Sequence, residues 1–177
     1  MEITTVGILG CGWFGLPFAK TLVQLGYKVK GSTTSAEKLK DLAALGIEPY
    51  QINLNDNGEL PAEFFKVDAL FVNVPPRAKS EAGSTYPDKL SAVVKAAEGK
   101  VKQVVFISST GVFEDGNFEV DENSKPQRDT DAGRALLAAE ELCSKNEQFT
   151  TTIIRFAGLI GPDRNLAKFF TGRNGVP

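Results

Sequence analysis

Three glycines near the N-terminus constrain the fold of this chain more than any other feature. Gly10, Gly12 and Gly15 follow the pattern G-x-G-x-x-G. An apolar run leads into the first glycine and a helical pattern follows the last, which indicates a strand, a tight turn and a helix in that order. In such a turn the first glycine makes the bend, the second leaves room beside the backbone, and the third lets the helix pack closely on the strand.

The residues after the glycines have helical periodicity. Phe14, Phe18, Leu22 and Leu25 fall on one face of a helix, and Gly26 ends the segment. The start of that helix would present free N–H groups and the positive end of the helix dipole to an anion. The pattern therefore predicts a dinucleotide site with the pyrophosphate over the turn, and a purely structural turn is the alternative. The binding residues expected in the turn are Gly10, Cys11, Gly12, Trp13, Phe14 and Gly15.

The composition excludes several classes of function. The 177 residues are enough for one domain with a hydrophobic core, expected to span 1–177. A formal net charge of −2 argues against nucleic-acid binding. No apolar run is long enough to span a membrane. The two cysteines are too few for a disulfide framework and suit the reducing cytoplasm. Because the chain has no histidine, histidine bases, Ser-His-Asp triads and His-ligated zinc are excluded, and no metal site is expected.

Strand and helix patterns alternate along the chain. This alternation, with continuously apolar strands at 69–72 and 104–107, is typical of a doubly wound α/β (Rossmann) domain around a buried parallel sheet. The expected strand order is 3-2-1-4-5-6. Strands are expected at about 4–9, 27–31, 47–53, 68–74, 102–108 and 151–157, and helices at about 13–25, 35–45, 85–98, 131–146 and 165–171.

The end of the second strand indicates which dinucleotide is preferred. An acidic residue there would bind the ribose 2′-hydroxyl of NAD, but the sequence offers Ser32, Thr33 and Thr34, with Lys38 a turn later. Hydroxyls and a cation suit the 2′-phosphate of NADP, so NADP is predicted, with NAD as the alternative. Under the competing interpretation of this stretch, Ser35 only caps the next helix.

The ends of the third and fourth strands are expected to complete the cofactor crevice. Asn53 and Leu54 close the third strand, where they would flank an adenine. Residues 73–76, read as Asn-Val-Pro-Pro, close the fourth strand, with Val74 and Pro75 expected at the cofactor. The prolines would stiffen a loop at the crevice or simply make a turn.

Two further segments carry a resemblance to a known family. Residues 105–113 read V-F-I-S-S-T-G-V-F, and residues 154–164 read I-R-F-A-G-L-I-G-P-D-R. With the glycine turn they resemble atypical, extended short-chain dehydrogenases/reductases of the NAD(P)-dependent epimerase/dehydratase branch, over nearly the whole chain. The resemblance implies that a strand-end hydroxyl binds the reacting oxygen of the substrate, unless it only satisfies backbone groups. The hydroxyl implied is that of Ser109, with Thr110 as the fallback, and the nicotinamide pocket would be lined by Ala157, Gly158 and Leu159. Arg155 is interpreted as structural, held in an ion pair.

The chain departs from this family in two places. The family's Y-x-x-x-K pair opens the helix after the fifth strand, but here Thr130 and Arg134 stand in those positions. Arg134 would replace the charge and ribose contact of the lysine, whereas a threonine hydroxyl is far too weak an acid to replace the tyrosine. The glycine spacing also differs, since extended members usually have G-x-x-G-x-x-G.

Three functions follow from these observations. The first is an NAD(P)-dependent oxidoreductase or epimerase for a small molecule, either nucleotide-sugar-like or otherwise hydroxylated. The second is a non-catalytic NAD(P)-binding sensor or interaction module. The third is the cofactor domain of a 6-phosphogluconate- or hydroxyacid-dehydrogenase-like enzyme.

Two expectations concern the rest of the protein. The family resemblance implies a homodimer formed through the helices at about 85–98 and 131–146. Because a turn-rich tail follows the sixth strand closely, a C-terminal substrate lobe is expected to be absent or truncated.

Overall fold

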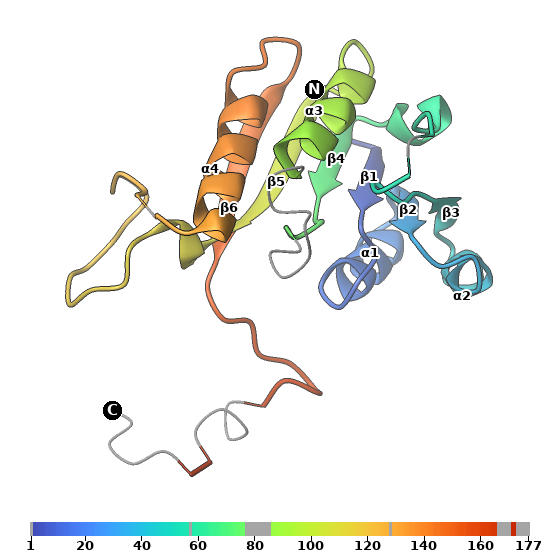
Figure 1. Cartoon of the computed structure of the whole chain (residues 1–177). Helices are drawn as coiled ribbons and strands as arrows, with labels where there is room; N and C mark the ends of the chain where they lie inside the picture. The colour runs from blue at the N-terminus through green and yellow to red at the C-terminus, as the bar shows by residue number, and fades with distance from the viewer. Residues whose placement is uncertain (1, 57, 77–85, 128, 166–170, 173–177) are drawn as a thin grey trace.

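Six parallel strands form one sheet at the centre of the molecule. The computed structural model describes residues 2–56, 58–76, 86–127, 129–165 and 171–172. The strand order β3-β2-β1-β4-β5-β6 confirms the predicted doubly wound topology (Figure 1). The strands are β1 (Thr5–Leu9), β2 (Lys28–Thr33), β3 (Glu48–Gln51), β4 (Ala69–Val72), β5 (Gln103–Ser109) and β6 (Thr150–Phe156).

Helices cover both faces of this sheet. Among the described residues, α1 (Gly15–Gln24) and α2 (Lys38–Ala44) pack on one face, and α3 (Tyr86–Ala97) and α4 (Asp131–Ser144) on the other (Figure 1). Two short 3-10 helices, η1 (Ala62–Phe65) and η2 (Thr110–Val112), are additions that the sequence pattern did not predict. The helix expected over 165–171 lies almost wholly outside the described residues.

The sheet divides the hydrophobic core into two clusters because its central strands are buried on both faces. The cluster under α1 and α2 includes Ile8, Ala19 and Leu42. The larger cluster, under α3 and α4, includes Leu90 and Phe106, both fully buried.

One expectation and one competing interpretation, both at helix ends, are wrong. Leu25, expected on the buried face of the first helix, is 69% exposed because α1 ends at Gln24 and the chain turns through Gly26. Ser35 does not cap the second helix, because α2 begins only at Lys38 and has no side-chain cap. The Ser35 N–H instead donates to Thr33 Oγ1 at 3.3 Å.

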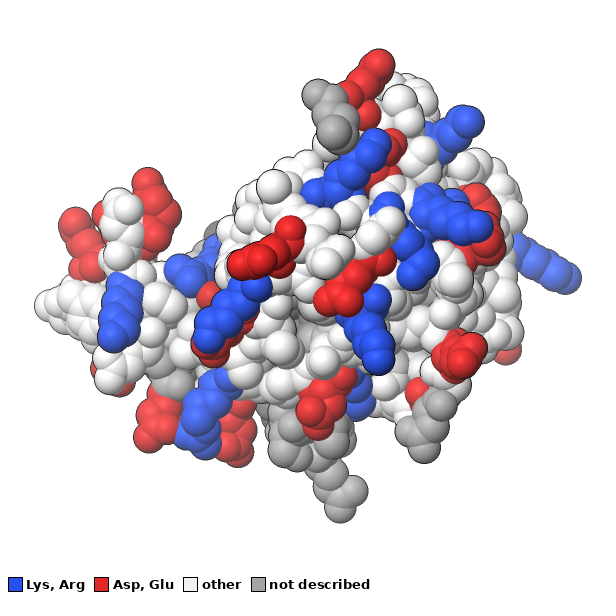
Figure 2. Space-filling view, turned by 90° about the horizontal axis from the view of Figure 1, so that it is seen from above, with Lys and Arg blue, Asp and Glu red and all other residues white. Residues whose placement is uncertain are grey.

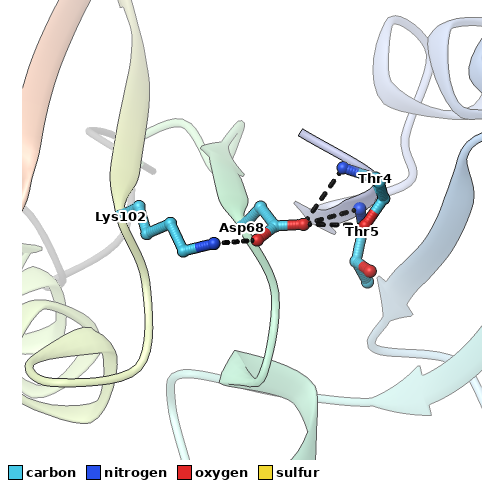
Figure 3. A network of polar contacts seen from close by, with 4 residues as sticks. All are labelled: Thr4, Thr5, Asp68 and Lys102. Atoms are coloured by element: carbon cyan, nitrogen blue, oxygen red, sulfur yellow. Dashed lines mark hydrogen bonds and ion pairs between the residues drawn. The ribbon is translucent and has the colours of Figure 1, made fainter. Parts of the chain in front are cut away.

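One carboxylate joins the beginnings of three neighbouring strands (Figure 3). Asp68, just before β4, accepts hydrogen bonds from the N–H groups of Thr4 and Thr5 at 3.0 Å, and from Lys102 Nζ at 2.6 Å. The Lys102 hydrogen bond, followed by those from Thr4 and Thr5, holds the pKa of Asp68 well below its usual range. This edge of the sheet is therefore fixed by structural contacts, and the opposite edge, where the parallel strands end, is the one that offers ligand sites.

Two observations concern the helices and the charge on one face of the surface. In the part of the chain that the structure describes, no helix combines the length and apolar character needed to cross a membrane. On the face shown in Figure 2, basic and acidic side chains are interspersed without a continuous basic stripe.

Candidate functional site

The glycine turn is close-packed at two of its glycines and open at the third. Gly10 has φ +102°, and a Cβ there would lie 2.5 Å from the carbonyl oxygen of Asn73. A Cβ on Gly15 would lie 2.2 Å from the carbonyl oxygen of Gly10. A Cβ on Gly12 would meet no atom within 4 Å, so the space above this residue is open. The first and third glycines therefore serve the fold, and the second faces free space.

Polar contacts from two strand ends hold the turn in place. Ser32 is 2% exposed, and its Oγ accepts a hydrogen bond from Gly10 N–H at 2.9 Å. Ser32, expected at a 2′-phosphate, thus lies beneath the turn with its hydroxyl directed at the backbone. Asn73, which the sequence analysis did not single out, donates from Nδ2 to the Gly10 carbonyl at 3.1 Å.

A cavity of about 520 Å³ lies at the C-terminal edge of the sheet. The glycine turn, the end of β4, the end of β5 and the segment after β6 all line it. The structure therefore brings together residues that are far apart in the sequence. The predicted site residues among its lining are Gly12, Trp13, Phe14, Val74, Pro75, Ser109, Ala157 and Gly158.

Two further cavities adjoin this central one. The smaller, of about 110 Å³, is lined by Thr34, Asn53 and Leu54 and shares Val74 and Pro75 with the central cavity. These shared residues place the two cavities side by side, between the end of β3 and the end of β5. The larger, of about 800 Å³, lies between α1 and α2, and its predicted site residues are Cys11, Gly12, Trp13, Phe14, Thr33 and Lys38.

Tyr86 is a second residue that the sequence analysis did not assign to the site. It lines the smaller cavity, and its hydroxyl donates to the Val74 carbonyl at 2.7 Å. Burial raises the pKa of Tyr86, which keeps that hydroxyl protonated as the donor. The sequence pattern predicts only a helix over this stretch, and it carries no signal for the contact with Val74.

The two hydroxyls at the end of β5, on Ser109 and Thr110, have different surroundings. Ser109 lines the central cavity, and its Oγ accepts from Gly111 N–H at 3.1 Å. An accepting hydroxyl keeps its proton for donation to a ligand oxygen, so the backbone contact and the predicted role are compatible. Thr110 is exposed, and its Oγ1 donates to the Phe156 carbonyl at 3.5 Å.

Thr130 and Arg134 lie at the start of α4. Thr130 caps the helix, with its Oγ1 accepting from Gly133 N–H at 3.1 Å. Arg134 pairs with Asp131 at 2.6 Å and also with Asp129. Neither residue is among the described residues that line the three cavities. A ribose contact from Arg134 would require its guanidinium to leave these carboxylates.

A buried charge network lies behind the central cavity. Glu140 on α4 is 5% exposed and accepts from Ser108 Oγ at 2.6 Å. Arg155 on β6 donates to both carboxylate oxygens of Glu140, at 3.0 and 2.8 Å, and these hydrogen bonds raise the pKa of Arg155. The ion pair expected of Arg155 is confirmed. The network joins α4 to the ends of β5 and β6, beside Ser109.

Comparisons with known proteins agree with this geometry. Residues 10–175 match the family described as NAD(P)H-binding. The chain is 30% identical over 174 residues to protein YeeZ of Escherichia coli K12, which covers 95% of this chain and 63% of YeeZ. The chain thus spans just under two thirds of the length of that relative.

Solved structures share the fold at lower identity. UDP-glucuronic acid 4-epimerase from Bacillus cereus in complex with NAD superposes with a TM-score of 0.71 at 18% identity, over 89% of this chain and 58% of that one. MoeE5 in complex with UDP-glucose and NAD gives 0.74 at 19% identity, over 94% and 58%. A short-chain dehydrogenase/reductase superfamily protein from Agrobacterium tumefaciens with bound NAD gives 0.67 at 19%, over 86% and 48%. The chain therefore belongs to the NAD(P)H-binding family, as a Rossmann domain whose structural neighbours include an epimerase in complex with NAD and a short-chain dehydrogenase/reductase superfamily protein.

Proposed function

We propose that this protein is an NADP-dependent oxidoreductase or epimerase acting on a nucleotide-sugar-like or other hydroxylated substrate. The observation that carries the proposal is the central cavity, where the glycine turn and Ser109 line one space. This arrangement places an element suited to a pyrophosphate beside a hydroxyl suited to a substrate oxygen. The substrate class is supported by the UDP-glucose and UDP-glucuronic acid bound in two of the structural neighbours.

We assign one part of the cofactor to each segment that lines these cavities. The adenine would lie beside Asn53 and Leu54, the pyrophosphate over Gly12, and the nicotinamide beside Ala157 and Gly158. When bound, the dinucleotide supplies the hydride acceptor or donor. Ser109 would donate a hydrogen bond to the oxygen on the reacting carbon.

Preference for NADP is the finer part of the proposal. Thr33 and Lys38 line the large cavity beside Gly12, and the end of β2 has no acidic residue. Lys38→Gln is expected to weaken NADP binding and leave NAD binding unchanged. Lys40→Gln is the matched control, because Lys40 is exposed on the same helix but does not line the described cavity. Competing calorimetric titrations measure both affinities, and equal or NAD-favoured binding by the unmodified protein contradicts the preference.

Catalysis is tested by consumption of reduced cofactor with carbonyl and nucleotide-sugar substrates. Slow turnover is expected because the position of the family's tyrosine holds Thr130, and general acid–base assistance is worth about 10²–10⁴-fold in rate. Ser109→Ala should abolish the residual rate. Ser144→Ala removes a hydroxyl on α4 whose hydrogen bond, among the described residues, goes to the Glu140 carbonyl, and it should leave the rate unchanged. Turnover that survives Ser109→Ala would remove Ser109 from the mechanism.

A non-catalytic NAD(P)-binding module is the second candidate. It is favoured by the start of α4, where no tyrosine is present and Arg134 is already paired with Asp129 and Asp131. Dinucleotide binding without turnover over the whole substrate screen would select this candidate.

A further inference from the structure

The segment after β6 folds back across the glycine turn and is held there by Trp13. The guanidinium carbon of Arg164 lies 4.0 Å from the centroid of the Trp13 ring, a cation–π contact. Trp13 Nε1 donates to Asp163 Oδ1 at 2.5 Å. Gly161 lies against the ring edge, because a Cβ there would be 2.5 Å from Trp13 Cζ2. Trp13 thus binds three residues of a segment about 150 positions away.

Arg164 differs from the other described arginines in having its donors free. Arg134 and Arg155 both pair with carboxylates, whereas no hydrogen bond or ion pair engages the Arg164 guanidinium within the described residues. A guanidinium on a ring face keeps its N–H groups available in the fork geometry that matches phosphate oxygens. Asp163, the adjacent carboxylate, is directed at the indole of Trp13.

The central cavity lacks any other charged side chain among the described residues that line it. Arg164 shares this lining with Gly12, Phe14 and Ser109. The start of α1, which is the positive end of the helix dipole, lies at the same place. Both features favour an anion over a neutral ligand.

We infer that Arg164, held on Trp13, binds a diphosphate in the central cavity. Its guanidinium donates hydrogen bonds to phosphate oxygens beside the open face of Gly12. This inference rests on the proposed function, and the diphosphate has two sources, the pyrophosphate of the dinucleotide or the diphosphate of a nucleotide-sugar substrate.

The test is calorimetric titration with NAD, NADP and UDP, the last into both cofactor-free and cofactor-saturated protein. Arg164→Gln removes both the positive charge and the paired N–H donors of the guanidinium, whereas Arg164→Lys keeps only the charge. Lys66→Gln is the control, because it removes one positive charge beside η1, where Lys66 pairs with Glu63 outside the cavity. Thermal unfolding checks that each variant is folded, which is expected since Arg164 is exposed.

Arg164→Gln should weaken diphosphate binding about tenfold to a hundredfold, the range for losing hydrogen bonds to a charged group. Arg164→Lys should give an intermediate loss and Lys66→Gln none. An equal loss for NAD and NADP assigns the pyrophosphate of the cofactor, and a loss confined to UDP assigns the substrate. Unchanged affinity for all three ligands in Arg164→Gln overturns the inference.

The proposed function can fail separately. If the unmodified protein binds neither dinucleotide, the proposed function is wrong, and the UDP titration still decides the role of Arg164. Binding of none of the three ligands overturns both. Trp13 is the only tryptophan, so its fluorescence reports the stacked contact directly. If the ligand-free Arg164→Gln variant has the same fluorescence emission as the ligand-free unmodified protein, the contact between Arg164 and Trp13 is refuted.

Discussion

Two substitutions in the glycine turn should separate folding from binding. In Gly12→Val the new side chain meets no atom within 4 Å of its Cβ, and the Gly12 backbone does not have a positive φ. The free energy of unfolding should therefore stay within about 0.5 kcal/mol of the unmodified protein. The isopropyl group would nevertheless occupy the space proposed for the pyrophosphate.

Gly15→Ala should have the opposite effect. Its methyl group would lie 2.2 Å from the Gly10 carbonyl oxygen, where an ordinary C···O contact is about 3.3–3.6 Å. Backbone must move by roughly 1 Å, and overpacking of this kind costs about 1–3 kcal/mol. For a chain of this length each kcal/mol lowers Tm by about 2–4 °C, so Tm should fall by about 2–12 °C.

Thermal unfolding and calorimetric titration with NAD and NADP measure the two effects. Gly12→Val should unfold at the temperature of the unmodified protein and bind both dinucleotides at least about tenfold more weakly. Gly12→Ala, which adds a single methyl group, should bind dinucleotide with an affinity between those of Gly12→Val and the unmodified protein. If Gly12→Val lowers Tm as much as Gly15→Ala, or binds dinucleotide normally, the assignment of roles within the turn is wrong.

Three further predictions concern other parts of the molecule. Because the folded state lowers the pKa of Asp68, its ionised form stabilises the protein above the unfolded pKa of about 3.9, and this contribution is lost as the pH falls below it. Asp68→Asn should lower the free energy of unfolding by about 1–3 kcal/mol at pH 7. It should also weaken the fall of this free energy at acid pH, measured by urea unfolding, and an unchanged pH dependence would contradict the prediction. Burial raises the pKa of the Cys11 and Cys143 thiols to about 11, so both should react slowly with a thiol reagent at pH 8 until urea is added; fast labelling of folded protein would count against it. Self-association through α3 and α4 should appear in light scattering at high concentration, and a monomeric mass there would refute it for this chain.

The sequence by itself determined the architecture, because its signals are local. The period of the apolar residues marks strands and helices, and glycine spacing marks the turn through backbone sterics alone. Parallel strands with right-handed crossovers then leave few topologies, and the observed order is the one predicted. The helix ends at Leu25 and Ser35 were missed because capping depends on the local backbone path, which the pattern does not specify.

Only the tertiary structure decided which polar groups meet. Ser32 follows β1 by more than twenty residues, yet the pairing of β1 with β2 brings its hydroxyl to the N–H group of Gly10. Tyr86 reaches Val74, and Arg164 reaches Trp13, because the sheet gathers the ends of distant strands at one edge. The residue type determines which hydrogen bonds a side chain can make, but its partner depends on burial and on the neighbours that the fold supplies.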